Sequence, residues 1–126
     1  PDLPSRRNGV PLPRLEDEDL AAGGLATYLH PPFFDEAALA EPFRRVSRGA
    51  ATIRMLGSGS VDLASVAAGT HVAWCQHSCP EWDWLPGRAL VEGAGGGCTT
   101  IEVNGYDWYV AGRPRAVHQA VALLRG

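Results

Sequence analysis

One aspartate in this chain has neighbours that suggest a defined role. Asp83 lies between Trp82 and Trp84 and is followed by an apolar run and then by a cluster of glycines. An aspartate oxygen can accept the free backbone N–H groups of a first helical turn, which makes aspartate a preferred N-cap. Pro86 then falls in that first turn, where a missing N–H costs little, and Gly93, Gly95 or Gly96 can end the helix. The spacing alone therefore favours a capped helix over about residues 83–93 that packs two indole rings.

A glycine-rich turn offers chemistry of a second kind. The segment Gly57-Ser58-Gly59-Ser60 follows a predicted strand and precedes a predicted helix. Backbone N–H groups at a helix N-terminus are free to bind an anion. A tight turn from a strand to a helix needs glycine in any case, so the turn taken alone favours a structural role.

Three residues with zinc-binding side chains alternate along one predicted strand. Cys75, His77 and Cys79 would lie on one face of an extended chain, and thiolates and imidazole are zinc ligands. Side chains on one face of one strand point the same way rather than around an ion. No second pair with zinc-finger spacing follows, unless Cys98 is the fourth ligand. A zinc-binding module is therefore an alternative to the simpler interpretation, which is buried thiols and a partly exposed histidine.

Strands and helices alternate along the chain that must position these residues. The predicted strands cover residues 22–29, 51–56, 71–77, 97–103 and 106–111, and the predicted helices cover residues 35–47, 61–69, 83–93 and 114–124. This alternation predicts an α/β fold, a layered and largely parallel sheet flanked by helices.

Shorter signals mark individual turns and helix ends. Asn8-Gly9 and Asn104-Gly105 predict tight turns between strands. Pro42 inside the helix predicted to be capped by Asp35 indicates a kink or two short helices. The acidic run over residues 16–19 is typical of a helix start, where negative charge suits the helix dipole.

Composition limits the classes of protein that fit. The 126 residues, with 45% hydrophobic, fit a single domain over 1–126 with a real core. A net charge of −3 without a basic block argues against nucleic acid as a partner. We expect no membrane span and no secretory signal, because neither a long apolar run nor a charged-then-apolar leader is visible. Three cysteines fit a reducing compartment, so we expect a cytoplasmic protein.

Several segments resemble the inositol monophosphatase family. Trp82-Asp83 followed by Leu90-Val91-Glu92-Gly93-Ala94-Gly95-Gly96 is similar to the family's Trp-Asp and Glu-Ala-Gly-Gly signature, with Gly93 as an extra residue. Arg54-Met55-Leu56-Gly57-Ser58-Gly59-Ser60 is similar to the family's Arg-x-x-Gly-(Ser/Thr)-Ala turn, with glycine in place of alanine. Asn8-Gly9-Val10-Pro11-Leu12 is similar to an Asn-Gly-x-Pro stretch near the middle of the family fold.

The resemblance implies a magnesium-dependent, often lithium-sensitive phosphatase. Its substrate would be a small phosphate monoester, inositol monophosphate or a related sugar or alcohol phosphate. In the family, Asp83 would be a Mg²⁺ ligand, and Gly57, Ser58 and Gly59 would contact the non-phosphate part of the substrate. Gln76 stands where the family commonly has an acidic residue that holds a substrate hydroxyl. Since ligands bind at strand ends in α/β sheets, we expect one cleft lined by these five residues.

The family's other metal ligands lie in its N-terminal half and do not occur in this sequence. The chain therefore resembles the C-terminal half of such an enzyme. We expect it to be inactive alone, because one carboxylate cannot make a Mg²⁺ site. The expected partners are the missing N-terminal half or a second subunit, a small phosphorylated substrate and, for the complete protein, a second copy in a homodimer. The alternative from another class is a non-catalytic binding or assembly module that has lost the catalytic half.

Overall fold

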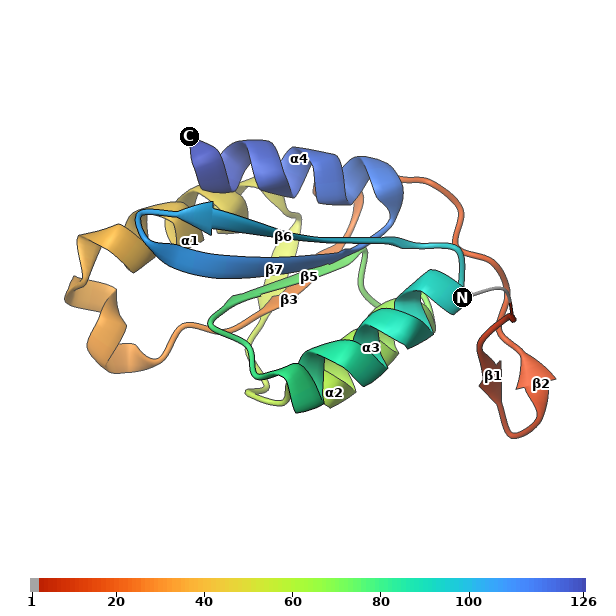
Figure 1. Cartoon of the computed structure of the whole chain (residues 1–126). Helices are drawn as coiled ribbons and strands as arrows, with labels where there is room; N and C mark the ends of the chain where they lie inside the picture. The colour runs from red at the N-terminus through yellow and green to blue at the C-terminus, as the bar shows by residue number, and fades with distance from the viewer. Residues whose placement is uncertain (1–2) are drawn as a thin grey trace.

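The computed structural model describes residues 3–126, and a five-stranded sheet lies at its centre (Figure 1). The strands are β3 (Gly24–Thr27), β4 (Thr52–Arg54), β5 (Ala73–His77), β6 (Gly97–Val103) and β7 (Tyr106–Gly112). Their order across the sheet is β4-β3-β5-β7-β6. β3 pairs in parallel with β4 and β5, whereas β7 pairs antiparallel with β5 and β6, so every strand except β7 runs in one direction. The predicted α/β fold with a largely parallel sheet is confirmed.

Two helices cover each face of this sheet. α1 (Ala37–Gly49) and α4 (Pro114–Arg125) lie above the sheet in Figure 1, and α2 (Gly59–Ala67) and α3 (Glu81–Gly93) lie below it. The two helices of each layer also pack against each other. Among residues 3–126, none of the helices combines the length and the hydropathy needed to cross a membrane.

Each face of the sheet has its own apolar core. Successive side chains of a strand point to opposite faces, so neighbouring residues belong to different cores. The core under α1 and α4 contains Leu25, Leu39, Val46, Cys75, Val110, Val117 and Leu124. The core under α2 and α3 contains Ala26, Leu63, Val66, Trp74, Trp84, Val91 and Ala111. Trp74 stacks on Trp84 with 5.8 Å between ring centroids, which joins β5 to α3.

Both predicted Asn-Gly turns are confirmed. β1 (Arg6–Arg7) and β2 (Val10–Pro11) form a two-stranded hairpin around Asn8-Gly9, where φ is 54° and 80°. Asn104-Gly105 joins β6 to β7 with φ of 54° and 85°. Positive φ at both central residues matches the right-handed twist of the paired strands, which is why asparagine and glycine occur here.

The helix that contains Pro42 is continuous. A short 3₁₀ helix, η2 (Pro31–Asp35), precedes α1, and Glu36 rather than the predicted Asp35 is the N-cap residue of α1. Pro42 has no N–H to donate to the carbonyl of Ala38, four residues earlier. Asn104 Nδ2 donates to that carbonyl over 3.0 Å instead. This replacement explains how one helix spans a segment for which the sequence predicted a kink or two short helices.

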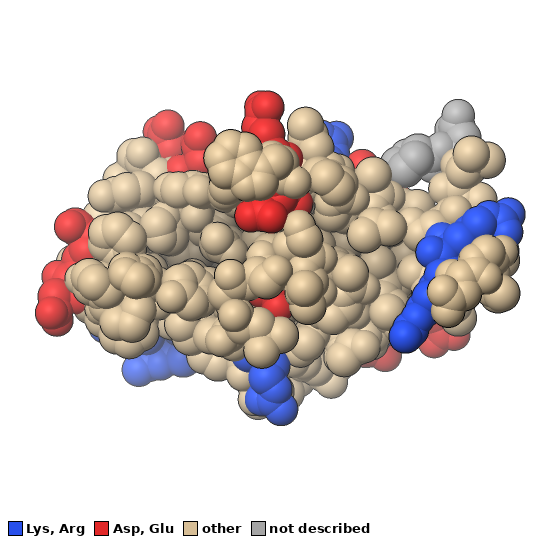
Figure 2. All heavy atoms as spheres, turned by 90° about the horizontal axis from the view of Figure 1, so that it is seen from below, with Lys and Arg blue, Asp and Glu red and all other residues tan. Residues whose placement is uncertain are grey.

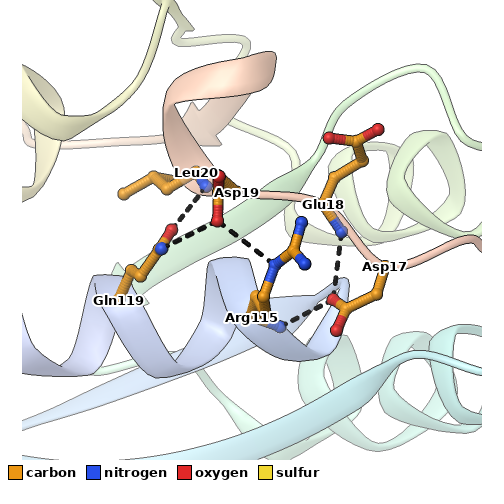
Figure 3. Close-up of polar contacts among 6 residues, drawn as sticks. All are labelled: Asp17, Glu18, Asp19, Leu20, Arg115 and Gln119. Carbon is orange, nitrogen blue, oxygen red and sulfur yellow. Dashed lines mark hydrogen bonds and ion pairs between the residues drawn. The ribbon is translucent and has the colours of Figure 1, made fainter.

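The acidic run stabilises a helix other than the one predicted. Only a short 3₁₀ helix, η1 (Leu20–Ala22), follows it. Asp17 Oδ1 accepts the backbone N–H of Arg115 over 2.8 Å, in the first turn of α4, as Figure 3 shows. Asp19 pairs with the Arg115 guanidinium over 3.2 Å and accepts a hydrogen bond from Gln119. The negative charge therefore complements the N-terminus of α4, about 98 residues away in sequence.

Candidate functional site

The five residues predicted to form a site come from three segments at one edge of the sheet. Because β3, β4 and β5 are parallel, their carboxyl ends share that edge. Gly57, Ser58 and Gly59 follow β4, Gln76 lies near the end of β5, and Asp83 lies in the first turn of α3. These five residues are hereafter the strand-end site.

Asp83 contacts the glycine turn directly. Ser60 Oγ donates a hydrogen bond to Asp83 Oδ1 over 3.0 Å. A Cβ atom added at Gly59 would lie 3.5 Å from the Asp83 Cβ, so the N-termini of α2 and α3 meet at this point. The proximity of the turn to Asp83 agrees with the sequence analysis. Ser60 was not among the predicted site residues, although it belongs to the same Gly-Ser-Gly-Ser segment.

Asp83 is not the N-cap of α3, and that prediction was wrong. The helix begins two residues earlier, at Glu81, and Pro80 is its N-cap residue. The Pro80 carbonyl accepts the backbone N–H groups of Asp83 and Trp84, each over 3.0 Å. The fixed φ of proline is compatible with entry into a helix, and the acidic residues of the first turn suit the dipole. The Asp83 carboxylate therefore accepts a hydrogen bond from Ser60 rather than capping its own helix.

The glycine turn has the backbone geometry that the sequence suggested. Gly57 has φ of +79°, in the left-handed region where a Cβ atom is unfavourable. Ser58 is the N-cap residue of α2, with an extended backbone. Within the part of the chain that the structure describes, the Ser58 side chain makes no capping hydrogen bond. The Ser58 side chain therefore leaves the first N–H groups of α2 without a cap. Uncapped N–H groups are what an anion binds at a helix N-terminus.

Gln76 faces the same side of the sheet as α2 and α3. It pairs with Tyr109 of β7, and Tyr109 packs against the core under these helices, with its ring 5.2 Å from that of Trp84. Cross-strand partners share a face, so the half-buried Gln76 points toward the layer that carries Asp83. The structure therefore places all five predicted residues at one edge and on one side of the sheet.

Tyr28 belongs to this region and was missed in the sequence analysis. It follows β3, and its ring lies against Gly57, with Cε1 3.5 Å from the position that a Gly57 Cβ would take. The only sequence signal was its place immediately after a buried strand. Its neighbours depend on the order of the strands in the sheet, and the local sequence pattern does not predict that order.

Asp62 in the first turn of α2 is a second missed feature. Its side chain is fully buried, and neither carboxyl oxygen has a hydrogen-bond partner within residues 3–126. Burial raises the pKa of this carboxyl from 3.8 to about 6. Desolvation disfavours the charged form when no donor compensates for lost water.

The three candidate zinc ligands do not all lie on one face of the sheet. Cys75 belongs to the core under α1 and α4, whereas Cys79 belongs to the core under α2 and α3. Burial raises the pKa of Cys75 to about 12 and that of Cys79 to about 11, which disfavours the thiolates that bind zinc. Neither observation supports a zinc module built on Cys75, His77 and Cys79.

The sequence predicts one Mg²⁺ ligand in this chain, Asp83. Mg²⁺ requires near-octahedral oxygen ligands, and Asp83 supplies one carboxylate. The described range 3–126 contains no group of three His, Cys, Asp or Glu side chains arranged to hold a metal. The assignment of Asp83 as a Mg²⁺ ligand stays a prediction.

A groove of about 640 Å³ lies elsewhere, between α1 and β4. Phe34, Phe43, Arg44 and Ile53 are among its lining residues. The strand-end residues do not line this groove, and the cleft expected around them stays a prediction.

Known proteins match this chain in sequence. The model of the inositol monophosphatase family matches residues 6–123. A probable inositol 1-monophosphatase of Mycobacterium tuberculosis, ImpA, is 32% identical over 98% of this chain and 48% of its own length. A relative from Pseudomonas aeruginosa named Nus factor SuhB is 44% identical over 54 residues, which are 43% of this chain and 20% of that protein.

Solved structures show the same fold. The inositol monophosphatase of Anabaena matches with a TM-score of 0.80 and 23% identity over 98% of this chain and 51% of that chain. A staphylococcal enzyme, SaIMPase-II with 2'AMP bound, matches with a TM-score of 0.80 and 20% identity over 95% and 48%. The chain thus spans about half the length of these relatives. The family model covers most of the chain, and the chain belongs to the inositol monophosphatase family.

Proposed function

We propose that this chain is the C-terminal half of a Mg²⁺-dependent phosphatase that hydrolyses a small phosphate monoester. The substrate would be inositol monophosphate or a related sugar or alcohol phosphate. The observation that carries the proposal is the contact of Asp83 with the glycine turn at the strand ends, in a chain that matches the inositol monophosphatase family over residues 6–123.

Each strand-end residue has a proposed role. Asp83 would supply one carboxylate oxygen to Mg²⁺, and the hydrogen bond from Ser60 would hold that carboxylate in place. Bound Mg²⁺ would supply Lewis acidity and a lowered pKa of bound water. Gly57, Ser58 and Gly59 would contact the alcohol part of the substrate, and Gln76 would hydrogen-bond one of its hydroxyl groups. Li⁺ would inhibit, as the family resemblance implies.

The outer face of α2 and α3 supports the proposal that this chain has a partner. Exposed apolar residues follow both helices on the side away from the sheet: Val61 and Ala64 on α2, Ala68 immediately after it, and Trp82, Leu85 and Leu90 on or near the same side of α3. Figure 2 shows this side of the molecule, where uncharged side chains cover most of the surface. A helix that is apolar on both sides is normally buried on both.

The other helix layer differs in charge. Its exposed residues include Glu41, Arg44 and Arg48 on α1, and Arg115 and His118 on α4. We therefore propose that the rest of the enzyme, about as long again as this chain in the relatives, covers α2 and α3 and supplies the missing metal ligands. The complete protein would be a cytoplasmic homodimer, and its three free thiols fit that compartment.

The experiment that tests this function compares two proteins. One is this chain alone, and the other is this chain joined to the polypeptide encoded upstream of it in its gene. We expect Mg²⁺-dependent release of phosphate from inositol 1-phosphate by the longer protein, inhibition by Li⁺, and no release by the chain alone. A longer protein that binds Mg²⁺ yet releases no phosphate from a panel of small monoesters would contradict the proposal.

A second candidate is a non-catalytic assembly module. It is favoured by the incomplete metal site within residues 3–126 and by the relative whose name, Nus factor SuhB, is not that of a phosphatase. The sequence upstream separates the two candidates. An Asp-x-x-Asp-Gly-Thr segment there would favour the enzyme, and a reading frame without it would favour the assembly module.

A further inference from the structure

We propose that Tyr28 is a specificity-determining residue of the strand-end site, and that its ring packs against the alcohol ring of the substrate beside Gln76. The inference rests on the proposed phosphatase function and adds a residue and a preference to it. The preference is for a cyclic alcohol over an acyclic one.

Strand register places Tyr28 beside Gln76. In the parallel pair β3–β5, Ala26 lies opposite Trp74 and Thr27 opposite Cys75. Continuing this register by one residue brings Tyr28 next to Gln76. Ala26 and Trp74 both belong to the core under α2 and α3, and side chains two residues apart in a strand share a face. Tyr28 and Gln76 therefore point to the same side of the sheet, at the strand ends where Asp83 lies.

Contacts hold the Tyr28 ring against the glycine turn. The ring packs on Gly57, where its Cε1 atom would be 3.5 Å from an added Cβ. The Tyr28 hydroxyl and His30 Nδ1 form a hydrogen bond of 3.3 Å. The ring is half-buried, so one part is fixed by the protein and another part remains accessible. Such a ring is a pre-positioned apolar wall next to the residues proposed to bind the alcohol.

The two side chains have complementary chemistry for a cyclic alcohol. Tyrosine presents an apolar ring face with a polar tip, and glutamine presents an amide that can both donate and accept hydrogen bonds. A sugar or cyclitol has an apolar face of C–H groups and hydroxyl groups at its rim, so it can use both. Glycerol phosphate has no ring face to pack on tyrosine. Pockets of this type fix orientation with a few polar groups and gain affinity from apolar contact.

The test uses the longer protein, with this chain joined to its upstream polypeptide, and two substrates. Inositol 1-phosphate has a cyclic alcohol, and glycerol 2-phosphate has an acyclic one. We expect Tyr28→Leu to raise KM for inositol 1-phosphate by about 10-fold while kcat changes by less than about 2-fold, because only substrate binding is lost. The KM for glycerol 2-phosphate should change by less than about 2-fold, since it makes no ring contact.

Two control variants separate this role from a structural one. Tyr28→Phe keeps the ring and removes only the hydroxyl, so it should retain most of the preference for inositol 1-phosphate even if Tyr28→Leu folds poorly. Phe34→Leu changes an exposed aromatic residue near α1 and should leave both KM values unchanged. Equal changes for both substrates in Tyr28→Leu, or no change for either, would overturn the inference. Failure of the unmodified protein to release phosphate from these two substrates and from the panel of small monoesters would instead overturn the proposed function on which the inference rests.

Discussion

Two aspartates in the first turns of neighbouring helices, α2 and α3, lie in different surroundings. Asp83 is half-buried and accepts a hydrogen bond from Ser60, so its charged form has a partner. Asp62 is fully buried, and its oxygens have no partner among residues 3–126. The first is suited to contribute an oxygen ligand, whereas the second destabilises the fold whenever it is ionised.

We predict that Asp62 makes the folded chain less stable as pH rises. Burial raises the pKa of Asp62 from 3.8 to about 6. The contribution of Asp62 to the unfolding free energy is therefore most favourable below pH 3.8, and this contribution is lost as pH rises through about 6. Relative to Asp62→Asn, the unmodified chain should lose about 2 kcal/mol of unfolding free energy between pH 4.5 and pH 7.5. Urea unfolding of both proteins at the two pH values measures this difference. Glu41→Gln changes an exposed carboxylate on α1 and keeps Asp62, so this control should lose as much as the unmodified chain.

At the scale of elements, the N-terminus of α4 depends on a segment from the other end of the chain. Asp17 accepts the Arg115 N–H, which would otherwise lack a partner within its helix. We predict that Asp17→Ala lowers the unfolding free energy by roughly 1 kcal/mol, the usual cost of losing a cap. Glu18→Ala changes the neighbouring exposed carboxylate and should have a much smaller effect. Equal losses in both variants would show that the contact with α4 is not what stabilises the chain.

The positions of most elements could be predicted because their signals are local. The spacing of apolar residues predicted the strands and helices, and Asn104-Gly105 predicted the turn between β6 and β7. The missed features depend on contacts between distant residues. Asp17 and Arg115 lie 98 residues apart, and Tyr28 follows a strand that is the sheet neighbour of the strand containing Gln76. The predicted cap at Asp83 failed because Pro80, three residues earlier, already begins the helix.

At the scale of the whole molecule, the two helix layers differ in what they expose. The outer side of α2 and α3 presents Trp82 with 78% of its surface exposed, Val61 with 56% and Leu85 with 51%. Exposed apolar patches of this kind mark surfaces that bind another protein or self-associate. We expect this asymmetry if α2 and α3 face another part of the complete protein, while α1 and α4 face solvent.

We predict that the isolated chain self-associates through this face. Introducing a charge with Leu85→Glu should shift the chain toward monomer in sedimentation velocity, because a buried unpaired carboxylate disfavours an apolar contact. Ala122→Glu introduces the same charge on the exposed side of α4 and should leave the association unchanged. A monomeric unmodified chain at high concentration, or equal effects of both variants, would contradict the proposed inner surface.

The most direct test of the account replaces the single proposed metal ligand. Phosphate release by the longer protein would be measured against Mg²⁺ concentration for the unmodified form, for Asp83→Asn and for Glu41→Gln. We predict that Asp83→Asn lowers kcat by at least about 100-fold, even at saturating Mg²⁺, while circular dichroism shows an intact fold. Glu41→Gln should behave as the unmodified protein does. Unchanged turnover of Asp83→Asn at saturating Mg²⁺ would show that Asp83 does not hold the metal.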